Sequence, residues 1–251
     1  MRPTILRPNA SPVDRFLSVL NASLDEGDAL EGKKILDCGA GGPVPPLAIF
    51  AEQGMDAYGI DISPDQVERS RAFCREVGLP MQLDVGDMRS LPFEDGSFDY
   101  VYEHYSMCHL SKADTARAIA EMHRVLKPGG IALLGVVSQD CWPLSSYGEE
   151  RAPGERWMDE HDRLVCHSLF TDREADALVS AWSIAWKERI TLHVGGGSVT
   201  KDAWMDLYEE APATCAREEW AKQYPDRRNL YRYVHLYYFL NKPQPSSPDP
   251  E

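Results

Sequence analysis

Short apolar segments alternate with helical patterns through the first 140 residues, and this alternation limits the fold more than any other feature. Strand patterns occur at KKILDCG, DAYGID, PMQLDVGDM, SFDYVYE and IALLGVV, which are residues 33–39, 56–61, 80–88, 97–103 and 131–137. Between them lie helical patterns, one of which starts as a capping box at Ser63 with Gln66 three residues on. Strands that alternate with helices imply right-handed crossovers and a parallel sheet. The sequence therefore predicts an α/β fold.

The regular alternation ends at Ser138. A long polar and aromatic connection follows, then a helical pattern at 171–182 and strand patterns at 186–194 and 231–240. Two further helical patterns occupy 198–210 and 214–224. We expect a single domain over 1–242, in which 138–170 and 195–225 form a cap or substrate region, and a disordered tail at 243–251.

Three glycines directly follow the first predicted strand: Gly39, Gly41 and Gly42. In a parallel sheet, ligands bind beyond the carboxyl ends of the strands, where this turn lies. Glycine permits a positive φ and lets a ligand approach the main chain, although a tight structural turn would need the same residues. Asp61 ends the second strand about 20 residues on, at the spacing of a carboxylate that binds ribose hydroxyls. Together these features favour a nucleoside ligand.

The glycine turn lacks the features of a phosphate site. A dinucleotide fingerprint would have glycine where Val44 stands, and no P-loop motif is present. Pro43, Pro45 and Pro46 remove amides that a helix N-terminus would offer to a phosphate. The ligand is therefore expected to carry no phosphate, which disfavours an NAD-dependent oxidoreductase.

Four stretches, in order, resemble the motifs of the class I S-adenosylmethionine-dependent methyltransferases. They are ILDCGAGG, GIDIS, GDMRSLPFEDGSFDYV and EMHRVLKPGG, and the resemblance covers about residues 33–137. It is closest to the small-molecule type, similar to the ubiquinone and menaquinone biosynthesis branch. Pro43 departs from the glycine usual in the family. The resemblance implies a Rossmann-like, seven-stranded and mostly parallel sheet with helices on both faces, an antiparallel last strand and an added cap.

The resemblance also implies the cofactor, S-adenosylmethionine, and the residues that bind it. Asp37, Gly39 and Gly41 are expected to line the methionine half of the cofactor, and Asp61 and Ile62 to lie at the ribose. Asp87 and Met88 are expected to contact the adenine amino group and ring. Glu103, at the end of the fourth predicted strand, is expected to approach the cofactor.

A sulfonium methyl group is already activated, so the protein must mainly align the acceptor and exclude water. A base is needed only where the acceptor loses a proton. His104 and His109, after the fourth strand, are candidate bases, with packed or solvated histidines as the alternative. Trp142, Trp157, His161 and His167 are candidate substrate residues because the connection that carries them follows the fifth strand. The expected function is direct methyl transfer to a small molecule; a catalytically degenerate cofactor-binding module or sensor is the alternative.

The composition limits the kinds of binding partner expected for this protein. The formal net charge is −14 and no dense Lys/Arg cluster occurs, which argues against nucleic acid. No apolar stretch approaches the roughly 20 residues of a membrane span, and the N-terminus lacks the apolar centre of a secretory signal. The six cysteines include no CxxC pair, so we expect reduced thiols, a cytoplasmic location and no metal site.

Overall fold

The computed structural model describes residues 11–142, 144–160, 163–195 and 230–245. Its centre is a sheet in the order β3-β2-β1-β4-β5-β10-β9. Five of these strands are parallel: β1 (Lys34–Cys38), β2 (Asp56–Asp61), β3 (Met81–Val85), β4 (Phe98–Glu103) and β5 (Leu126–Ser138). β10 (Leu230–Asn241) runs antiparallel to both β5 and β9 (Ser183–Gly195). The expected mostly parallel sheet with an antiparallel last strand is confirmed, and among the described residues three further strands extend it to ten.

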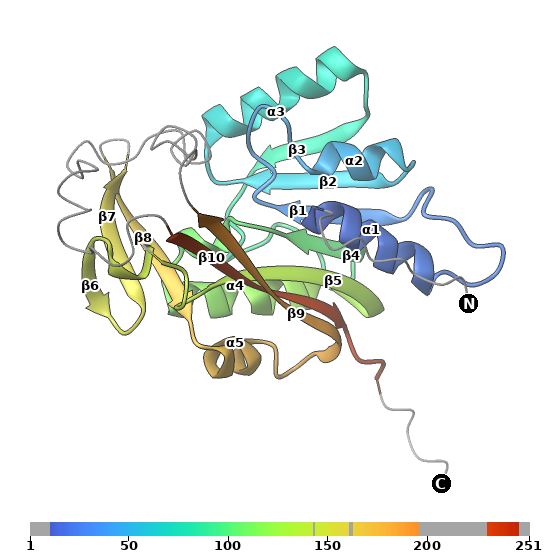
Figure 1. The fold of residues 1–251 in the computed structure, drawn as a ribbon. Coiled ribbons are helices and arrows are strands. Elements are labelled where there is room, and N and C mark those ends of the chain that lie inside the picture. The colour runs from blue at the N-terminus through green and yellow to red at the C-terminus, as the bar shows by residue number, and fades with distance from the viewer. Residues whose placement is uncertain (1–10, 143, 161–162, 196–229, 246–251) are drawn as a thin grey trace, which may run out of the picture.

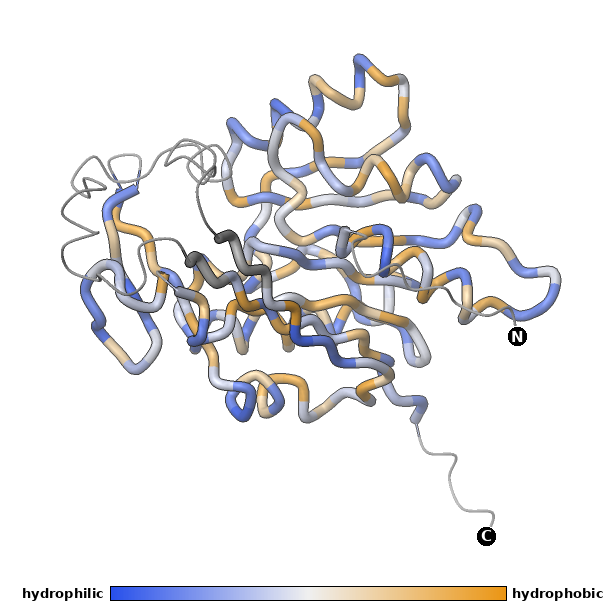
Figure 2. The backbone as a smooth tube through the Cα atoms, in the orientation of Figure 1, coloured by the Kyte–Doolittle hydropathy of each residue, from blue (hydrophilic) through white to orange (hydrophobic). Residues whose placement is uncertain are grey.

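Helices cover both faces of this sheet (Figure 1). The first face packs α1 (Pro12–Ser23), α2 (Leu47–Glu52) and α3 (Pro64–Val77) in one core cluster that includes Phe16 and Phe50. The second face packs α4 (Lys112–Val125) and α5 (Asp172–Leu178) in another cluster. Alternate residues of each central strand point to opposite faces, so a strand such as β5 is buried throughout its second half. Figure 2 shows this as hydrophobic colour along the central strands.

Local signals explain where the helices begin and end. The Ser63 side chain accepts a hydrogen bond from the Gln66 amide at the start of α3, and Gly78 ends the helix in the left-handed conformation. Ser111 caps α4 in the same way, through the Asp114 amide. A side-chain cap of this kind contributes about 1 kcal/mol. These capping residues therefore fix where α3 begins and ends and where α4 begins.

The connection after β5 is more regular than the sequence indicates. It contains an antiparallel meander of β6 (Glu149–Ala152), β7 (Glu155–Glu160) and β8 (Arg163–Phe170), which lies within 138–170, the first segment of the expected cap or substrate region. β8 joins the main sheet through a short parallel pairing of residues 169–170 with 137–138, at the carboxyl end of β5. β6 and β7 were missed because both are mostly polar and neither has a buried face: β6 is mostly exposed and β7 half-exposed, so they lack the alternation of a half-buried strand. The helical patterns at 198–210 and 214–224 lie outside the described residues.

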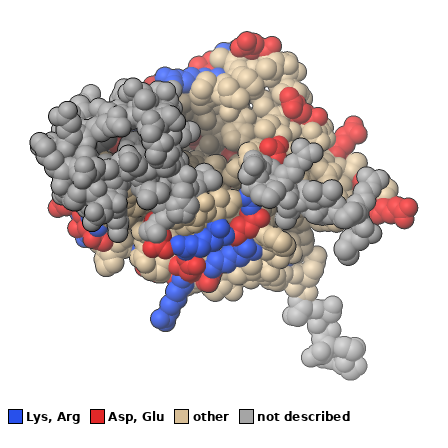
Figure 3. All heavy atoms as spheres, viewed as in Figure 1, with Lys and Arg blue, Asp and Glu red and all other residues tan. Residues whose placement is uncertain are grey.

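Charges of both signs are mixed on the face seen in Figure 3. Lysine and arginine side chains of β9 pair with carboxylates: Lys187 with Asp176, and Arg189 with Asp140 and Asp172. Among the described residues, no helix has both the length and the apolar character needed to cross a bilayer.

Candidate functional site

The glycine turn after β1 is a close-packed junction. Gly39 has a φ of 100°, and its amide donates to the Ile60 carbonyl oxygen at 2.8 Å. A β-carbon on Gly39 would overlap the Ser106 side chain, and one on Gly41 would overlap the Asp61 carboxylate. Glycine is therefore required at both positions because neighbouring side chains come too close for a β-carbon. At Gly39 the positive φ is a second reason.

Asp61 lies where β2 ends, facing this turn. Its Oδ2 accepts a hydrogen bond from the Gly41 amide at 3.1 Å, and its Oδ1 accepts one from the Ser63 amide at 2.8 Å. An ionised carboxylate has about four lone-pair sites, so two such bonds leave each oxygen able to accept another. The next residue, Ile62, exposes 64% of its surface and presents an apolar side chain beside the carboxylate. The pair suits a ligand with hydroxyl groups and an apolar ring.

Asp37 is a buried carboxylate below the same turn, only 2% exposed. No described side chain caps α2, which follows Pro45 and Pro46, so the Asp37 carboxylate is not a helix cap. Its Oδ2 has no partner in the described structure. Burial raises the pKa of Asp37 well above its usual range, and the neighbouring carboxylates of Glu103 and Asp61 raise it further.

These carboxylates permit a test of which ligand fits the turn. A phosphate would add negative charge to three carboxylates that already repel one another. A ligand with positive charge would relieve that repulsion and stabilise the ionised acids. S-Adenosylmethionine fits, because it combines a sulfonium and an ammonium group with a ribose and an adenine ring.

Glu103 ends β4 and has no exposed surface. Its Oε1 accepts hydrogen bonds from the amides of Ser106 at 2.9 Å and Met107 at 2.8 Å, and its Oε2 lies 3.4 Å from the Gly135 amide nitrogen. Burial raises the pKa of Glu103 to about 7, although the three amides act in the opposite direction. The side chain thus positions the loop whose Ser106 lies against Gly39. Its role as a direct cofactor contact stays a prediction.

Asp87 and Met88 follow β3 at the same edge. The Asp87 carboxylate accepts hydrogen bonds from the Arg89 backbone amide at 2.9 Å and from the Arg89 guanidinium at 2.7 Å, and these bonds lower its pKa. Arg89 also pairs with Asp114 at 2.9 Å. Met88 is partly buried against the core cluster of the second face. The expected contacts with adenine remain predictions, and Arg89 is a neighbour that the sequence did not indicate.

His104 belongs to a network that includes two residues missed from the sequence. The Tyr237 hydroxyl lies 3.0 Å from His104 Nε2 and 3.0 Å from His235 Nδ1. The ring of Tyr105, a non-glycine residue with a φ of 72°, stacks on His235 with centroids 5.1 Å apart. Burial lowers the pKa of both histidines to about 4. The alternation of β10 was the available signal, since residues 235 and 237 share one side of a strand.

The remaining candidates are placed differently. His109, the second candidate base, contacts His167 with ring centroids 4.8 Å apart. Trp142 is 6% exposed, whereas Trp157 is half-buried with the Arg151 guanidinium 5.1 Å from its ring centroid. His167 is buried on β8, and His161 lies outside the described residues.

Comparison with known proteins agrees with this geometry. Residues 36–134 match a family described as a methyltransferase domain. Over 107 residues the chain is 41% identical to the 24-methylenesterol C-methyltransferase 2 of Oryza sativa subsp. japonica, a match that covers 41% of this chain and 28% of the relative. The chain is also 33% identical over 138 residues to the methyltransferase GfsG of Streptomyces halstedii, covering 54% and 48% of the two chains. The matches thus span less than half the length of these curated relatives.

Solved structures share the fold at low identity. A SAM-dependent methyltransferase of Methanosarcina mazei superposes with a TM-score of 0.62 and 18% identity, over 90% of this chain and 98% of that one. The same fold, with a TM-score of 0.58, 22% identity and coverage of 96% and 86%, occurs in the [4+2]-cyclase SpnF. The family match covers the glycine turn and its acids, so residues 36–134 of this chain are similar to a methyltransferase domain, and the chain shares the fold of a SAM-dependent methyltransferase.

Proposed function

We propose that this protein transfers the methyl group of S-adenosylmethionine to a small-molecule acceptor. The observation that carries the proposal is the Asp61 carboxylate, which the Gly41 and Ser63 amides hold at the end of β2 with acceptor capacity to spare. That is the arrangement a ribose diol requires, and the crowded acids around it favour a cationic ligand over a phosphorylated one.

When bound, S-adenosylmethionine supplies a methyl group that is already activated by the sulfonium. The residues of the chain then have to orient the acceptor and keep water out. A histidine with a pKa of about 4 is neutral at pH 7, so His104 offers a lone pair or an N–H rather than a charge. Through Tyr237 it is linked to His235, and this network supports a role in accepting a proton from an acceptor.

The relatives support the acceptor class. Those reported above are named for methyl transfer, one of them to a sterol carbon, and the methyltransferase-domain match at residues 36–134 covers the glycine turn. In this chain the β6–β8 meander follows the carboxyl end of β5 and places Trp157 and His167 on that side of the sheet. We infer that this meander, rather than the glycine turn, selects the acceptor.

The cofactor half of the proposal is tested by calorimetry with S-adenosylmethionine, S-adenosylhomocysteine and NADH. Asp61→Asn should weaken S-adenosylmethionine binding by about 10- to 100-fold, the size of a lost charge-assisted hydrogen bond. Asp56→Asn is the matched control, because Asp56 is exposed at the opposite end of the same strand. Equal affinities for the two variants would remove Asp61 from the site, and tighter binding of NADH would overturn the proposal.

The transfer step is tested with S-adenosylmethionine labelled in its methyl group and an extract of small metabolites. We expect label in a low-molecular-weight product with the wild type and much less with Asp61→Asn. Tight cofactor binding with no transfer to any acceptor would instead support the sensor alternative. The fold also occurs in SpnF, which is described as a cyclase and not as a methyltransferase, so the fold alone does not decide between the two outcomes.

A further inference from the structure

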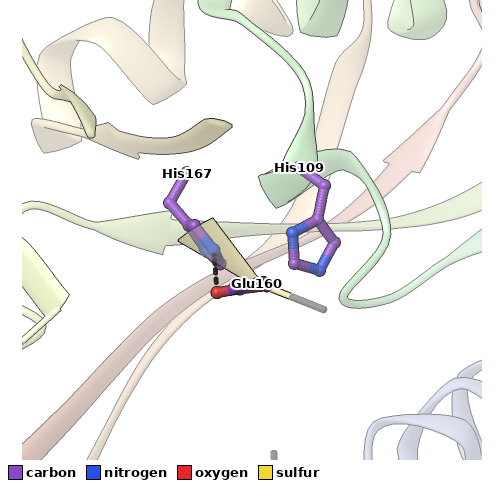
Figure 4. A group of neighbouring side chains, drawn as sticks. All are labelled: His109, Glu160 and His167. Atoms are coloured by element: carbon purple, nitrogen blue, oxygen red, sulfur yellow. Dashed lines mark hydrogen bonds and ion pairs between the residues drawn. The ribbon is translucent and has the colours of Figure 1, made fainter. Parts of the chain in front are cut away.

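Two side chains of the meander, Glu160 at the end of β7 and His167 on β8, converge with His109 from the segment after β4 (Figure 4). His167 Nε2 lies 2.6 Å from Glu160 Oε1, and the His109 ring meets the His167 ring nearly at right angles, at 75°. One ligand atom from each residue lies within 4.8 Å of the others. Among the described residues, this is the group of histidines and acids that could hold a metal ion.

Two imidazoles and one carboxylate are a common ligand set for first-row divalent metals. A tetrahedral zinc ion, with bonds of about 2.1 Å, holds its ligand atoms about 3.4 Å apart. The His167–Glu160 pair must therefore open by a little under 1 Å, and the His109 nitrogen must move closer by up to about 1.4 Å. Both movements are within the reach of side-chain rotations, since Glu160 is partly exposed and His109 is exposed.

The position of the group matters as much as its chemistry. His109 ends η1 (Met107–His109), in the segment after β4 whose Ser106 lies against Gly39. His167 lies on β8, which pairs with the carboxyl end of β5. The three side chains thus lie on the side of the sheet where ligands of parallel α/β proteins bind, next to the proposed cofactor turn.

We propose that His109, Glu160 and His167 bind one divalent transition-metal ion, such as Zn²⁺ or Co²⁺, with coordination positions left open for an oxygen of the acceptor. Three protein ligands with open positions are typical of catalytic rather than structural metal sites. His167 is buried and His109 exposed, so the open positions lie on the His109 side. The acceptor part of this inference rests on the proposed function, whereas the metal part does not. The three positions are too far apart in sequence to form a short motif, which explains why the sequence predicted no metal site.

Metal binding can be measured without turnover. The full chain, freed of any affinity tag, is stripped with a chelator and dialysed against Zn²⁺, and its bound metal is determined by mass spectrometry. We expect one ion per chain in the wild type and at least about 10-fold weaker binding in His109→Ala and Glu160→Gln, because each loses a ligand. His123→Gln and Glu149→Gln are the matched controls, since neither residue belongs to the group.

Absence of bound zinc in the wild type, or full retention in both ligand variants, would overturn the site. The affinity for S-adenosylmethionine is measured in the same samples and should be unchanged in the ligand variants. A protein that binds the cofactor but no metal thus contradicts this inference alone, whereas one that binds metal but no cofactor contradicts the proposed function alone.

The open positions are tested with Co²⁺, whose visible spectrum reports its coordination. Acetohydroxamate, a small ligand with two oxygens, should change the spectrum of the Co²⁺-loaded wild type. An unchanged spectrum would show a closed coordination shell and would overturn the assignment to an acceptor oxygen.

Discussion

The two halves of the proposed site are built in different ways. The proposed cofactor half depends on backbone groups and acids within residues 37–61, where close contacts with glycine fix the positions. The proposed acceptor half is assembled from side chains of separate elements: His104 with Tyr237 and His235, and His109 with Glu160 and His167. A nucleoside cofactor common to many enzymes can be held by a local motif, whereas an acceptor specific to one enzyme is held by what the individual chain adds around it.

The largest effect is expected in the cofactor half, from Gly39→Ala. Gly39 and Gly42 both have a positive φ, so alanine should cost about 1–3 kcal/mol of unfolding free energy at either position. At Gly39 the new methyl group would also overlap Ser106 and displace the loop, whereas at Gly42 it would meet nothing within 4 Å. We therefore expect Gly39→Ala to lose about 100-fold in S-adenosylmethionine affinity by calorimetry, equivalent to ~2.7 kcal/mol.

Gly42→Ala is the control for this comparison. It should lose similar stability in a thermal unfolding experiment but keep its cofactor affinity to within about 10-fold. If both variants bind equally poorly, backbone strain rather than close packing governs the cofactor half.

The second effect concerns pH and the acceptor half. Burial lowers the pKa of His104 and His235 to about 4, below the value near 6.5 in an unfolded chain. Their contribution to stability is full above pH ~6.5 and is lost as the pH falls toward about 4. Between pH ~6.5 and ~5 the unfolding free energy should drop by about 1–2 kcal/mol for each histidine.

Glu103 acts in the opposite direction, because its folded pKa of about 7 exceeds the unfolded value near 4.5, so its contribution falls as the pH rises. Comparing the wild type with His235→Asn separates the contribution of the histidines to the pH dependence of stability from that of Glu103. The variant should show a flatter loss of stability on acidification in urea unfolding series at several pH values. Parallel curves for the two proteins would show that His235 does not titrate as a buried group.

The sequence was sufficient for those parts of the molecule that local chemistry determines. The caps at Ser63 and Gly78, the glycine turn and Asp61 are where the residue pattern placed them, because each depends on neighbours in the chain. The pairing of β8 with β5, the contact of Tyr237 with His104 and the Arg89–Asp114 ion pair join separate elements. Such contacts follow from tertiary packing, which residue spacing does not specify.

The third effect tests whether the meander selects the acceptor. Trp157 is half-buried on β7 beside Arg151, so Trp157→Ala should cost only about 1 kcal/mol of stability. We expect it to raise the KM for the acceptor several-fold, by about 1 kcal/mol, with the S-adenosylmethionine affinity unchanged. Trp142 is buried and its replacement by alanine would cost about 3–5 kcal/mol, so Trp142→Phe is the usable companion. A parallel loss of cofactor affinity in Trp157→Ala would place this residue in the cofactor half.

The smallest effect is expected at Asp87, which belongs to the proposed cofactor half but is positioned by a side chain, as residues of the proposed acceptor half are. The Asp87 carboxylate is predicted to accept a hydrogen bond from the adenine amino group. It is positioned by hydrogen bonds from the side chain of Arg89 and not by backbone amides alone. Both partners are about a third exposed, and such ion pairs contribute about 0–1 kcal/mol. Asp87→Asn keeps one acceptor oxygen, so S-adenosylmethionine affinity should fall only about 3- to 5-fold, or ~0.6–1 kcal/mol.

Arg89→Gln leaves the carboxylate in place and should change the affinity by less than about 2-fold, because Asp87 then has more acceptor capacity free for adenine. If Arg89→Gln instead weakens binding as much as Asp87→Asn does, the adenine end depends on a side-chain pair, and only the ribose and methionine ends belong to the backbone-held half.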